Sequence, residues 1–189
     1  GKKYKVEESK HNPSVKVVVE VVNEAKQFDK DYISLMPTNL YGYNDNFDLK
    51  SSHVLPAMIR KFHEAKENNH SPVSLWGSGK PMREFLFVDD LAQAVIFALE
   101  NKLSSHLYNV GSGKDVTIKE LAETIQNIVG HKGEIRWDSS KPDGTPRKLM
   151  DVSKMKSIGW EYSTEFSNPL GQPIIMVLGS TPENPKVVD

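Results

Sequence analysis

The sequence predicts an α/β fold that contains only part of a doubly wound sheet. Short apolar runs typical of strands alternate along the chain with segments whose apolar residues recur at helical spacing. Gly, Pro, Asn and Asp residues separate these runs, as is usual for turns. The strand–helix–strand units are too few for a complete parallel sheet with helices on both faces. We therefore expect the chain to form one part of a larger arrangement.

The first predicted element is a helix that begins at Pro13. Residues 1–12 are polar and rich in lysine, which predicts a loop. Asn12 can then cap a helix whose first residue is Pro13, where the missing N–H group costs nothing. The apolar residues at helical spacing are Val15, Val18, Val22 and Ala25. The β-branched residues between them favour a strand instead, and they are Val17, Val19 and Val21.

Five apolar runs predict strands. They span residues 31–36, 73–76, 84–88, 106–110 and 134–137. Gly, Pro or charged residues bound each run, which is typical of short buried strands that enter loops.

Two helices are predicted among the first four of these strands. Residues 52–66 place five apolar side chains on one stripe, namely Val54, Leu55, Met58, Ile59 and Phe62. Asp89 or Asp90 can cap the second helix. Its predicted inward positions are Leu91, Val95, Ala98 and Leu99.

The clearest helix signal follows the fourth predicted strand. Thr117 and Glu120 have the spacing of a capping box, and Gly130 is placed to end the helix that they open. Residues 141–147 are dense in Pro, Gly and charge, which predicts a loop. Residues 151–158 predict a short helix at most.

Composition excludes several classes of protein. The 189 residues include 24 Lys and Arg against 25 Asp and Glu, whereas nucleic-acid binding needs a surplus of basic groups. The chain has no cysteine, which excludes disulfides and thiolate metal sites and fits a reducing compartment. No apolar run approaches the roughly 20 residues of a membrane span, and no export signal is visible. We therefore predict a soluble, cytoplasmic protein without nucleic-acid or membrane partners.

Two Gly-x-Gly-Lys stretches, residues 77–80 and 111–114, do not meet the requirements of a phosphate-binding P-loop. That loop needs Gly five positions before the Gly-Lys pair and Ser or Thr after it, and both stretches lack these residues. None of the twelve glycines forms a G-x-G-x-x-G dinucleotide fingerprint, and no Tyr is followed four residues later by Lys. The six histidines show no metal-ligand spacing, so we predict no metal site.

Four segments carry a more specific signal in combination. They are YISLMPTNLYG (32–42), DNFDLKSSHVLPAMIRKFHEAK (45–66), WGSGKPMREFLFVDDLAQAV (76–95) and KPDGTPRKLMD (141–151). In this order they resemble the C-terminal part of the GDP-L-fucose synthases, which are extended short-chain dehydrogenase/reductases. The resemblance runs from about residue 31 to about residue 160. It implies an incomplete Rossmann-type sheet edge plus a small α/β substrate-binding domain, in a protein that uses NADP and a GDP-sugar.

The resemblance implies roles for one histidine and one loop. His53 matches the acid/base histidine that serves the family's 3,5-epimerisation. An imidazole titrates near neutral pH and can exchange the proton on a carbon next to a keto group. Without the resemblance, a helix-capping or surface histidine would be the favoured interpretation. Pro37, Thr38, Asn39 and Leu40 match the loop that contacts the nicotinamide end of NADP.

Five further residues match substrate positions of the family. Arg83 and Lys148 match cations that meet the GDP diphosphate, where a guanidinium can bind phosphate oxygens in a bidentate way. Lys61 stands where the family usually has arginine, and a solvated helix face is the alternative. Trp76 matches a substrate-lining aromatic residue, although a lone Trp at a strand end is more often in the core. Asp143 matches a polar substrate contact, with an ordinary turn aspartate as the alternative.

Two signatures of the family's N-terminal half are missing from the sequence. The glycine-rich fingerprint does not occur, and the positions of the Tyr-x-x-x-Lys pair hold Lys10 and Ser14. The phenol of that pair protonates the forming alkoxide during reduction. We therefore expect no reductase activity from this chain alone, and weak or no NADP binding. The resemblance divides the chain into a remnant of the dinucleotide-binding domain (1–50), a substrate-binding region (51–162) and a divergent Pro/Gly-rich tail (163–189).

Three hypotheses follow. The chain is the GDP-sugar-binding part of a GDP-L-fucose synthase-like protein, or it is one piece of an active enzyme that a missing N-terminal half completes. Alternatively, it is a non-catalytic interaction module that forms a homodimer, because an incomplete sheet exposes strand edges and apolar helix faces. For the same reason we expect the helices at 54–62 and 91–99 to lack part of the contacts that would normally bury their apolar faces.

Overall fold

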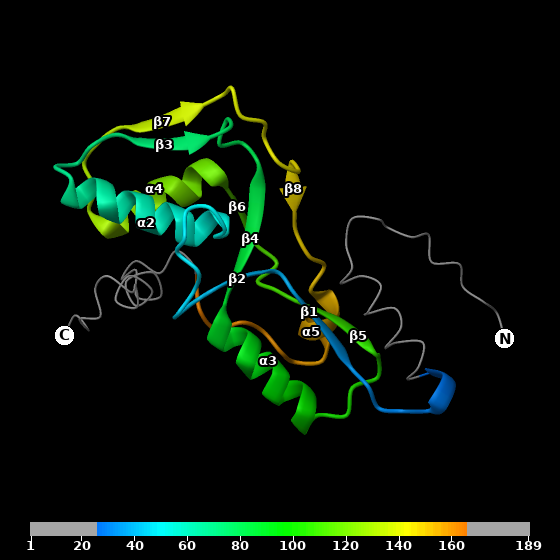
Figure 1. Ribbon diagram of the computed structural model, residues 1–189. Helices are drawn as coiled ribbons and strands as arrows, with labels where there is room; N and C mark the ends of the chain where they lie inside the picture. The colour runs from blue at the N-terminus through cyan, green and yellow to red at the C-terminus, as the bar shows by residue number, and fades with distance from the viewer. Residues whose placement is uncertain (1–25, 166–189) are drawn as a thin grey trace, which may run out of the picture.

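The computed structural model describes residues 26–165, in which one strand joins two groups of helices and strands (Figure 1). This strand is β4 (Met82–Phe87), and it continues directly into α3 (Val88–Glu100). One group contains α2 (Val54–Glu67), α4 (Ile118–Val129), β3 (Val73–Trp76) and β7 (Ile135–Asp138). The other contains α3, α5 (Ser153–Ser157), β1 (Ser34–Pro37) and β5 (Leu107–Val110).

Strand β4 is the centre of the strand pairing. Its C-terminal half pairs in parallel with β2 (Asn39–Tyr41). Its N-terminal half lies between β6 (Asp115–Thr117), which is antiparallel, and β8 (Arg147–Lys148), which is parallel. The pairs β1–β5 and β3–β7 are both parallel and lie on either side of this central sheet. Parallel strands joined through helices confirm the predicted α/β class.

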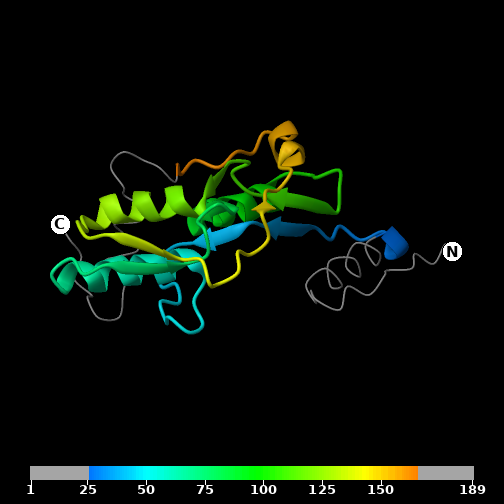
Figure 2. The same cartoon turned by 90° about the horizontal axis from the view of Figure 1, so that it is seen from above.

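The side chains of β4 alternate between two hydrophobic cores. Phe85 and Phe87 pack with α2, α4 and β3, whereas Leu86 packs with Tyr108 of β5 and Met155 of α5. Successive side chains of a strand point to opposite faces, so β4 belongs to both cores at once. Figure 2 shows α2 and α4 running alongside each other at one end of the molecule and β1 at the other. The division of the chain at residues 50 and 162 stays a prediction.

The start of α3 differs from the sequence prediction. Its N-cap residue is Phe87, so the prediction that Asp89 or Asp90 caps the helix is wrong. The reason is that β4 runs into α3 without a loop, which puts the last strand residue in the capping position. Asp90 is buried instead and accepts hydrogen bonds from the backbone N–H groups of Ser163 (2.9 Å) and Thr164 (3.2 Å).

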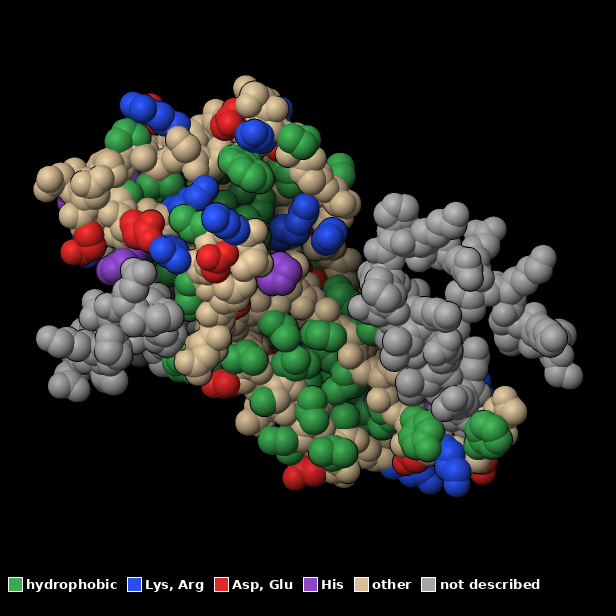
Figure 3. Space-filling model, viewed as in Figure 1, with side chains coloured by type: hydrophobic (Ala, Val, Ile, Leu, Met, Phe, Trp, Pro, Cys, Tyr) green, Lys and Arg blue, Asp and Glu red, His purple; other side chains and the backbone are tan. Residues whose placement is uncertain are grey.

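The exposed face of α3 also departs from the prediction. Val95 and Leu99, which we expected to point inward, are 42% and 82% exposed, while Ala94 and Ala98 are buried. The helix is apolar on two sides, and periodicity does not tell which side has a partner. Figure 3 shows hydrophobic side chains gathered over this part of the molecule. These exposed residues agree with the expectation that the apolar face at residues 91–99 is only partly buried. In α2, by contrast, most of the apolar stripe is buried.

Helix α4 begins and ends as predicted. The Glu120 backbone N–H donates to Thr117 Oγ1 at 3.0 Å, and the Thr117 N–H donates to Glu120 Oε2 at 2.8 Å, which completes the capping box. Gly130 follows the helix with φ 76°, in the left-handed region that glycine adopts without strain.

Replacement of the capping threonine tests this local account. We expect Thr117→Ala to lower the free energy of unfolding by about 1 kcal/mol, because the Glu120 N–H loses its acceptor. Thr124→Ala is the matched control, since Thr124 lies inside the same helix and donates only to the Glu120 carbonyl. Urea unfolding of both variants measures the difference, and equal losses would contradict the capping role.

Several predicted features lie outside the described residues. These are the loop of residues 1–12, the helix that begins at Pro13, the positions of Lys10 and Ser14, and the tail beyond residue 165. All five predicted strands are present, with bounds within three residues of those expected. Strands β2, β6 and β8 were not expected, because two or three residues are too few for a period to show. Between residues 26 and 165 no helix has both the length and the apolar character to cross a bilayer.

Candidate functional site

A cavity of about 640 Å³ opens where β2, the start of α2 and the paired strands β4 and β8 meet. Three residues with predicted roles in chemistry or charge line it, namely His53, Arg83 and Lys148. Thr38, Asn39 and Leu40 of the predicted cofactor loop also line it. Figure 3 shows a histidine beside a group of Lys and Arg side chains near the middle of one face of the molecule. The structure therefore brings together residues that lie far apart in the sequence.

Arg83 and Lys148 form the cationic wall of the cavity. They are register partners on the neighbouring parallel strands β4 and β8, so their side chains leave the same face of the sheet. Arg83 Nη1 donates to the carbonyls of Met82 (2.6 Å) and Thr145 (2.7 Å), which fixes the guanidinium. Neither cation pairs with a carboxylate among residues 26–165. Two adjacent positive charges without an acidic partner favour a bound anion.

His53 stands at the amino end of α2, at the mouth of the same cavity. It is the N-cap residue by backbone conformation, but its side chain makes no capping hydrogen bond. The capping interpretation therefore does not describe its imidazole. The ring is exposed at a cavity wall that also includes the first residues of α2. It is free to meet a ligand that the cations hold.

The side chains of Thr38, between β1 and β2, and Asn39, the first residue of β2, attach this segment to β4. Asn39 Nδ2 donates to the Glu84 carbonyl at 2.8 Å, and Thr38 Oγ1 donates to the same oxygen at 3.4 Å. Pro37 ends β1 and does not line the cavity. Thr38, Asn39 and Leu40 thus lie at the cavity, and their predicted role toward a dinucleotide stays a prediction. No glycine-rich loop occurs in the sequence to hold a pyrophosphate, so the residues present do not fit a whole dinucleotide.

Comparison with known proteins shows the family of the chain. Residues 15–111, just over half of the 189 residues, match the family model described as the NAD dependent epimerase/dehydratase family. The chain belongs to this family.

Within this family, the chain is most informatively compared with individual curated relatives. GDP-L-fucose synthase 1 of Arabidopsis thaliana is 55% identical over 142 residues, which are 75% of this chain and 44% of the relative. GDP-L-fucose synthase of Escherichia coli K12 is 52% identical over 147 residues, which are 72% of this chain and 46% of the relative. The chain thus spans less than half the length of these curated relatives.

Solved structures show the same architecture. A GDP-L-fucose synthetase from Naegleria fowleri matches with a TM-score of 0.74 and 27% identity, over 89% of this chain and 51% of that one. A second structure of that enzyme, bound to NADP, matches with a TM-score of 0.70 and 26% identity, over 86% and 49% of the two chains. The epimerase/dehydratase fold is thereby shown for this chain.

Lys61 of this family member lies in a second cavity, of about 410 Å³, between α2 and the start of β3. Its Nζ donates to the Ser74 carbonyl at 3.1 Å. Partial burial lowers the pKa of the Lys61 ammonium, because desolvation disfavours the charged form. A fully solvated helix face is therefore not the right description of this side chain, and the residue does not line the cavity of His53.

Trp76 and Asp143 also lie outside the lining of the main cavity. Trp76 ends β3 with 71% of its surface exposed, and the Lys141 ammonium lies 5.6 Å from the centre of its ring. The alternative of a core tryptophan is therefore wrong. Asp143 accepts from the N–H (2.7 Å) and the hydroxyl (2.6 Å) of Ser78, and these bonds lower the pKa of its carboxyl. Through these two hydrogen bonds, Asp143 holds the loop of residues 139–146 against the turn after β3.

Sequence reasoning missed four residues at this site. Tyr41, Tyr43 and Asp45 line the cavity, and burial raises the pKa of the Tyr41 phenol. Glu84 is fully buried in β4, between Arg83 and Phe85, which line the cavity. Glu84 had a usable signal, because it is an acidic residue inside an otherwise apolar run. The others stand in a short strand and a loop where no periodicity distinguishes them.

Proposed function

We propose that this chain provides the GDP-sugar-binding part of a GDP-L-fucose synthase. The observation that carries the proposal is the paired Arg83 and Lys148 in one cavity with His53, without a carboxylate partner among the described residues. The relatives named GDP-L-fucose synthase support a guanosine diphospho-sugar as the anion. A guanidinium and an ammonium together can hold both phosphates of such a ligand.

The roles of the remaining residues belong to the same proposal. The His53 imidazole exchanges the proton on the carbon next to the keto group of the sugar during epimerisation. Pro37, Thr38, Asn39 and Leu40 face the nicotinamide end of NADP in the complete protein. Lys61, Trp76 and Asp143, which each match a substrate position of the family, contact the substrate beyond the cavity itself.

The whole reaction of the family, NADP-dependent epimerisation and reduction of GDP-4-keto-6-deoxy-mannose, needs more than these residues. No Tyr-x-x-x-Lys pair occurs in the sequence, so the proposal assigns no reduction to this chain alone. An N-terminal half that carries this pair is the partner that the proposal requires for that step, because a second copy of this chain would lack the pair as well. The absence of cysteine supports a cytoplasmic location.

Titration calorimetry tests the proposal directly. We expect GDP to bind the chain and guanosine to bind at least about tenfold more weakly, because the two cations contact only the diphosphate. NADPH absorbance should stay constant when the chain alone is mixed with the keto-sugar. The sample is first shown to unfold cooperatively. Absence of heat at millimolar GDP in that sample would refute GDP-sugar binding.

A second candidate function is a non-catalytic interaction module. The exposed apolar residues of α3 favour it, and they are Val95, Ile96 and Leu99. Light scattering separates the two functions. Self-association that is indifferent to Arg83→Ala, together with no nucleotide binding, would favour the interaction module.

A further inference from the structure

Glu84 is a fully buried carboxylate beneath the candidate site, and it follows Arg83 in β4. Within residues 26–165 no Lys, Arg or His forms an ion pair with it. Two backbone N–H groups and the Ser112 hydroxyl, which donates to Oε1 at 3.4 Å, satisfy its oxygens instead. The Gly113 N–H donates to Oε1 at 2.7 Å, and the Met150 N–H donates to Oε2 at 2.9 Å. A buried carboxylate is tolerated only when such donors satisfy it, so both contacts matter.

The contact to Met150 bears on the position of Lys148. Strand β8 has only two residues, and it pairs with β4 through Arg147 and Lys148 alone. One further anchor is the pair of Arg147 with Asp115, whose nitrogen–oxygen distances are 2.6 and 3.1 Å. Just before β8, the carbonyls of Thr145 and Pro146 accept from Arg83 Nη1 and the Met82 N–H. After β8, the Met150 N–H, two residues beyond Lys148, donates to Glu84. Glu84 thus fixes the end of β8 that carries the ammonium.

The same residue contacts two other segments. Its carbonyl accepts from the side chains of Thr38, which follows β1, and Asn39, which begins β2. Its Oε1 lies so close to Gly111 that a Cβ at this position would collide with it. Glu84 therefore joins the loop of residues 37–40, the turn of residues 111–113 and the segment after β8. These three segments are far apart in the sequence, and all of them contact Glu84.

We propose that Glu84 is a positioning residue, which sets the spacing of Arg83 and Lys148 for the two phosphates of GDP. This inference rests on the proposed GDP binding. A carboxylate has two oxygens that accept, one for each backbone N–H, whereas a carboxamide has one oxygen and one donor. An amide at position 84 would therefore turn its own N–H₂ toward either Gly113 N–H or Met150 N–H, and that bond would be lost.

Glu84→Gln is the test, because it preserves shape and removes one acceptor. Asp90→Asn is the matched control. Asp90 is also buried and accepts a backbone N–H at each oxygen, but these belong to Ser163 and Thr164, which do not line the cavity of His53. We expect Glu84→Gln to weaken GDP binding by about 5- to 50-fold, and Asp90→Asn by less than about twofold. Hydrogen exchange should accelerate at residues 147–150 in the first variant only.

The Lys148→Ala background shows whether Glu84 acts through the ammonium. With the Lys148 ammonium removed, Glu84 can no longer position it. The further effect of Glu84→Gln on GDP affinity should therefore fall below about threefold. Fully additive losses, or unchanged exchange at residues 147–150, would overturn the inference. If the amide variant does not fold, Glu84→Asp keeps the charge, shortens its reach and is judged by the same outcomes.

The test separates this inference from the proposed function. A wild-type chain that does not bind GDP overturns both. A wild-type chain that binds GDP, with binding that is weakened by Arg83→Ala and untouched by Glu84→Gln, overturns the positioning role alone.

Discussion

Arg83→Ala is expected to weaken GDP binding by about 10- to 100-fold, which is the loss of a charge-assisted contact to phosphate. Two backbone carbonyls already orient the guanidinium, so a ligand does not have to order this side chain on binding. Arg83→Lys should lie between the wild type and the alanine variant, because an ammonium keeps the charge and loses the planar fork. Titration calorimetry with GDP at fixed salt measures all three proteins.

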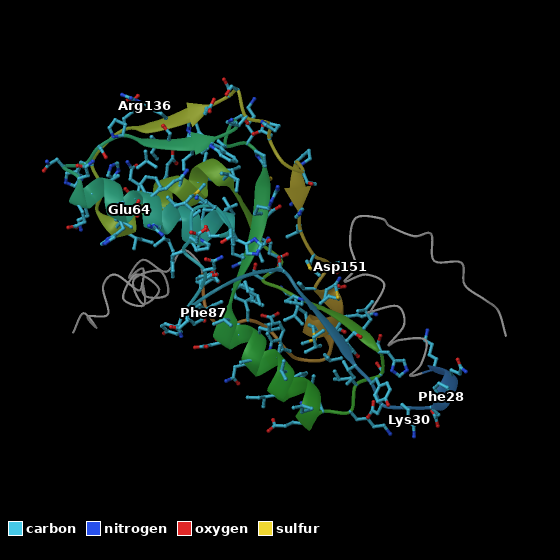
Figure 4. The ribbon with its side chains drawn as sticks, in the orientation of Figure 1. Phe28, Lys30, Glu64, Phe87, Arg136 and Asp151 are labelled. Carbon is cyan, nitrogen blue, oxygen red and sulfur yellow. The ribbon has the colours of Figure 1, made fainter. Side chains whose placement is uncertain are left out.

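Arg136→Ala is the control for removal of one positive charge. Arg136 lies on β7, at the outer edge of the molecule labelled in Figure 4, and its Nε donates to Glu134 at 2.8 Å. We expect this variant to bind GDP within about twofold of the wild type at moderate salt, since exposed charges beyond about 10 Å are screened. Equal losses in the two alanine variants would mean that GDP senses net charge and not this cavity.

The limits of individual helices and strands could be predicted from the sequence better than which of their faces other segments bury. Capping signals are local, so the limits of α4 at Thr117 and Gly130 could be predicted from a few residues. Which apolar face of α3 is covered depends on distant segments, and Val95 and Leu99 were assigned wrongly for that reason. Strand β8 has two residues and exists only because β4 lies beside it.

The candidate site shows a similar limit. The resemblance indicated Arg83, Lys148 and His53, and the structure brings all three to one cavity. It indicated Trp76 and Asp143 in the same way, and these lie outside that cavity lining, because Trp76 ends β3 and Asp143 stands in the loop after β7. Matching residues by position does not tell which of them share a cavity. The role of Glu84 depends on hydrogen bonds to residues 29 and 66 positions away in the sequence, for which no local pattern exists.

Leu86→Ala is expected to lower the free energy of unfolding by about 2–5 kcal/mol, as other buried leucines do. Leu86 is 1% exposed and belongs to the core of α5 and β5. Its neighbours Phe85 and Phe87 belong to the other core. Loss of order at Leu86 therefore removes the strand that both cores share, and we expect the two cores to unfold together.

Tryptophan fluorescence can follow each core separately. Trp160 is buried in the core of Leu86, and Trp137 packs against the core of Phe85. Variants that keep one of these two, with the other and Trp76 replaced by Phe, should show the same urea midpoint. Leu86→Ala should lower both midpoints equally, whereas Leu49→Ala, at an exposed loop position, should change either by less than about 0.5 kcal/mol.

Equal urea midpoints of the two tryptophan signals would also explain how Leu86→Ala, which lies outside the cavity, affects GDP binding. Arg83 belongs to β4, and Lys148 is held against β4, so the cationic wall exists only while this strand is ordered. GDP should then raise both midpoints of Leu86→Ala by the same amount, because a ligand that binds only the folded chain stabilises every part that unfolds with its site. A shift that is confined to the Trp137 signal would show instead that the core of Leu86 unfolds independently.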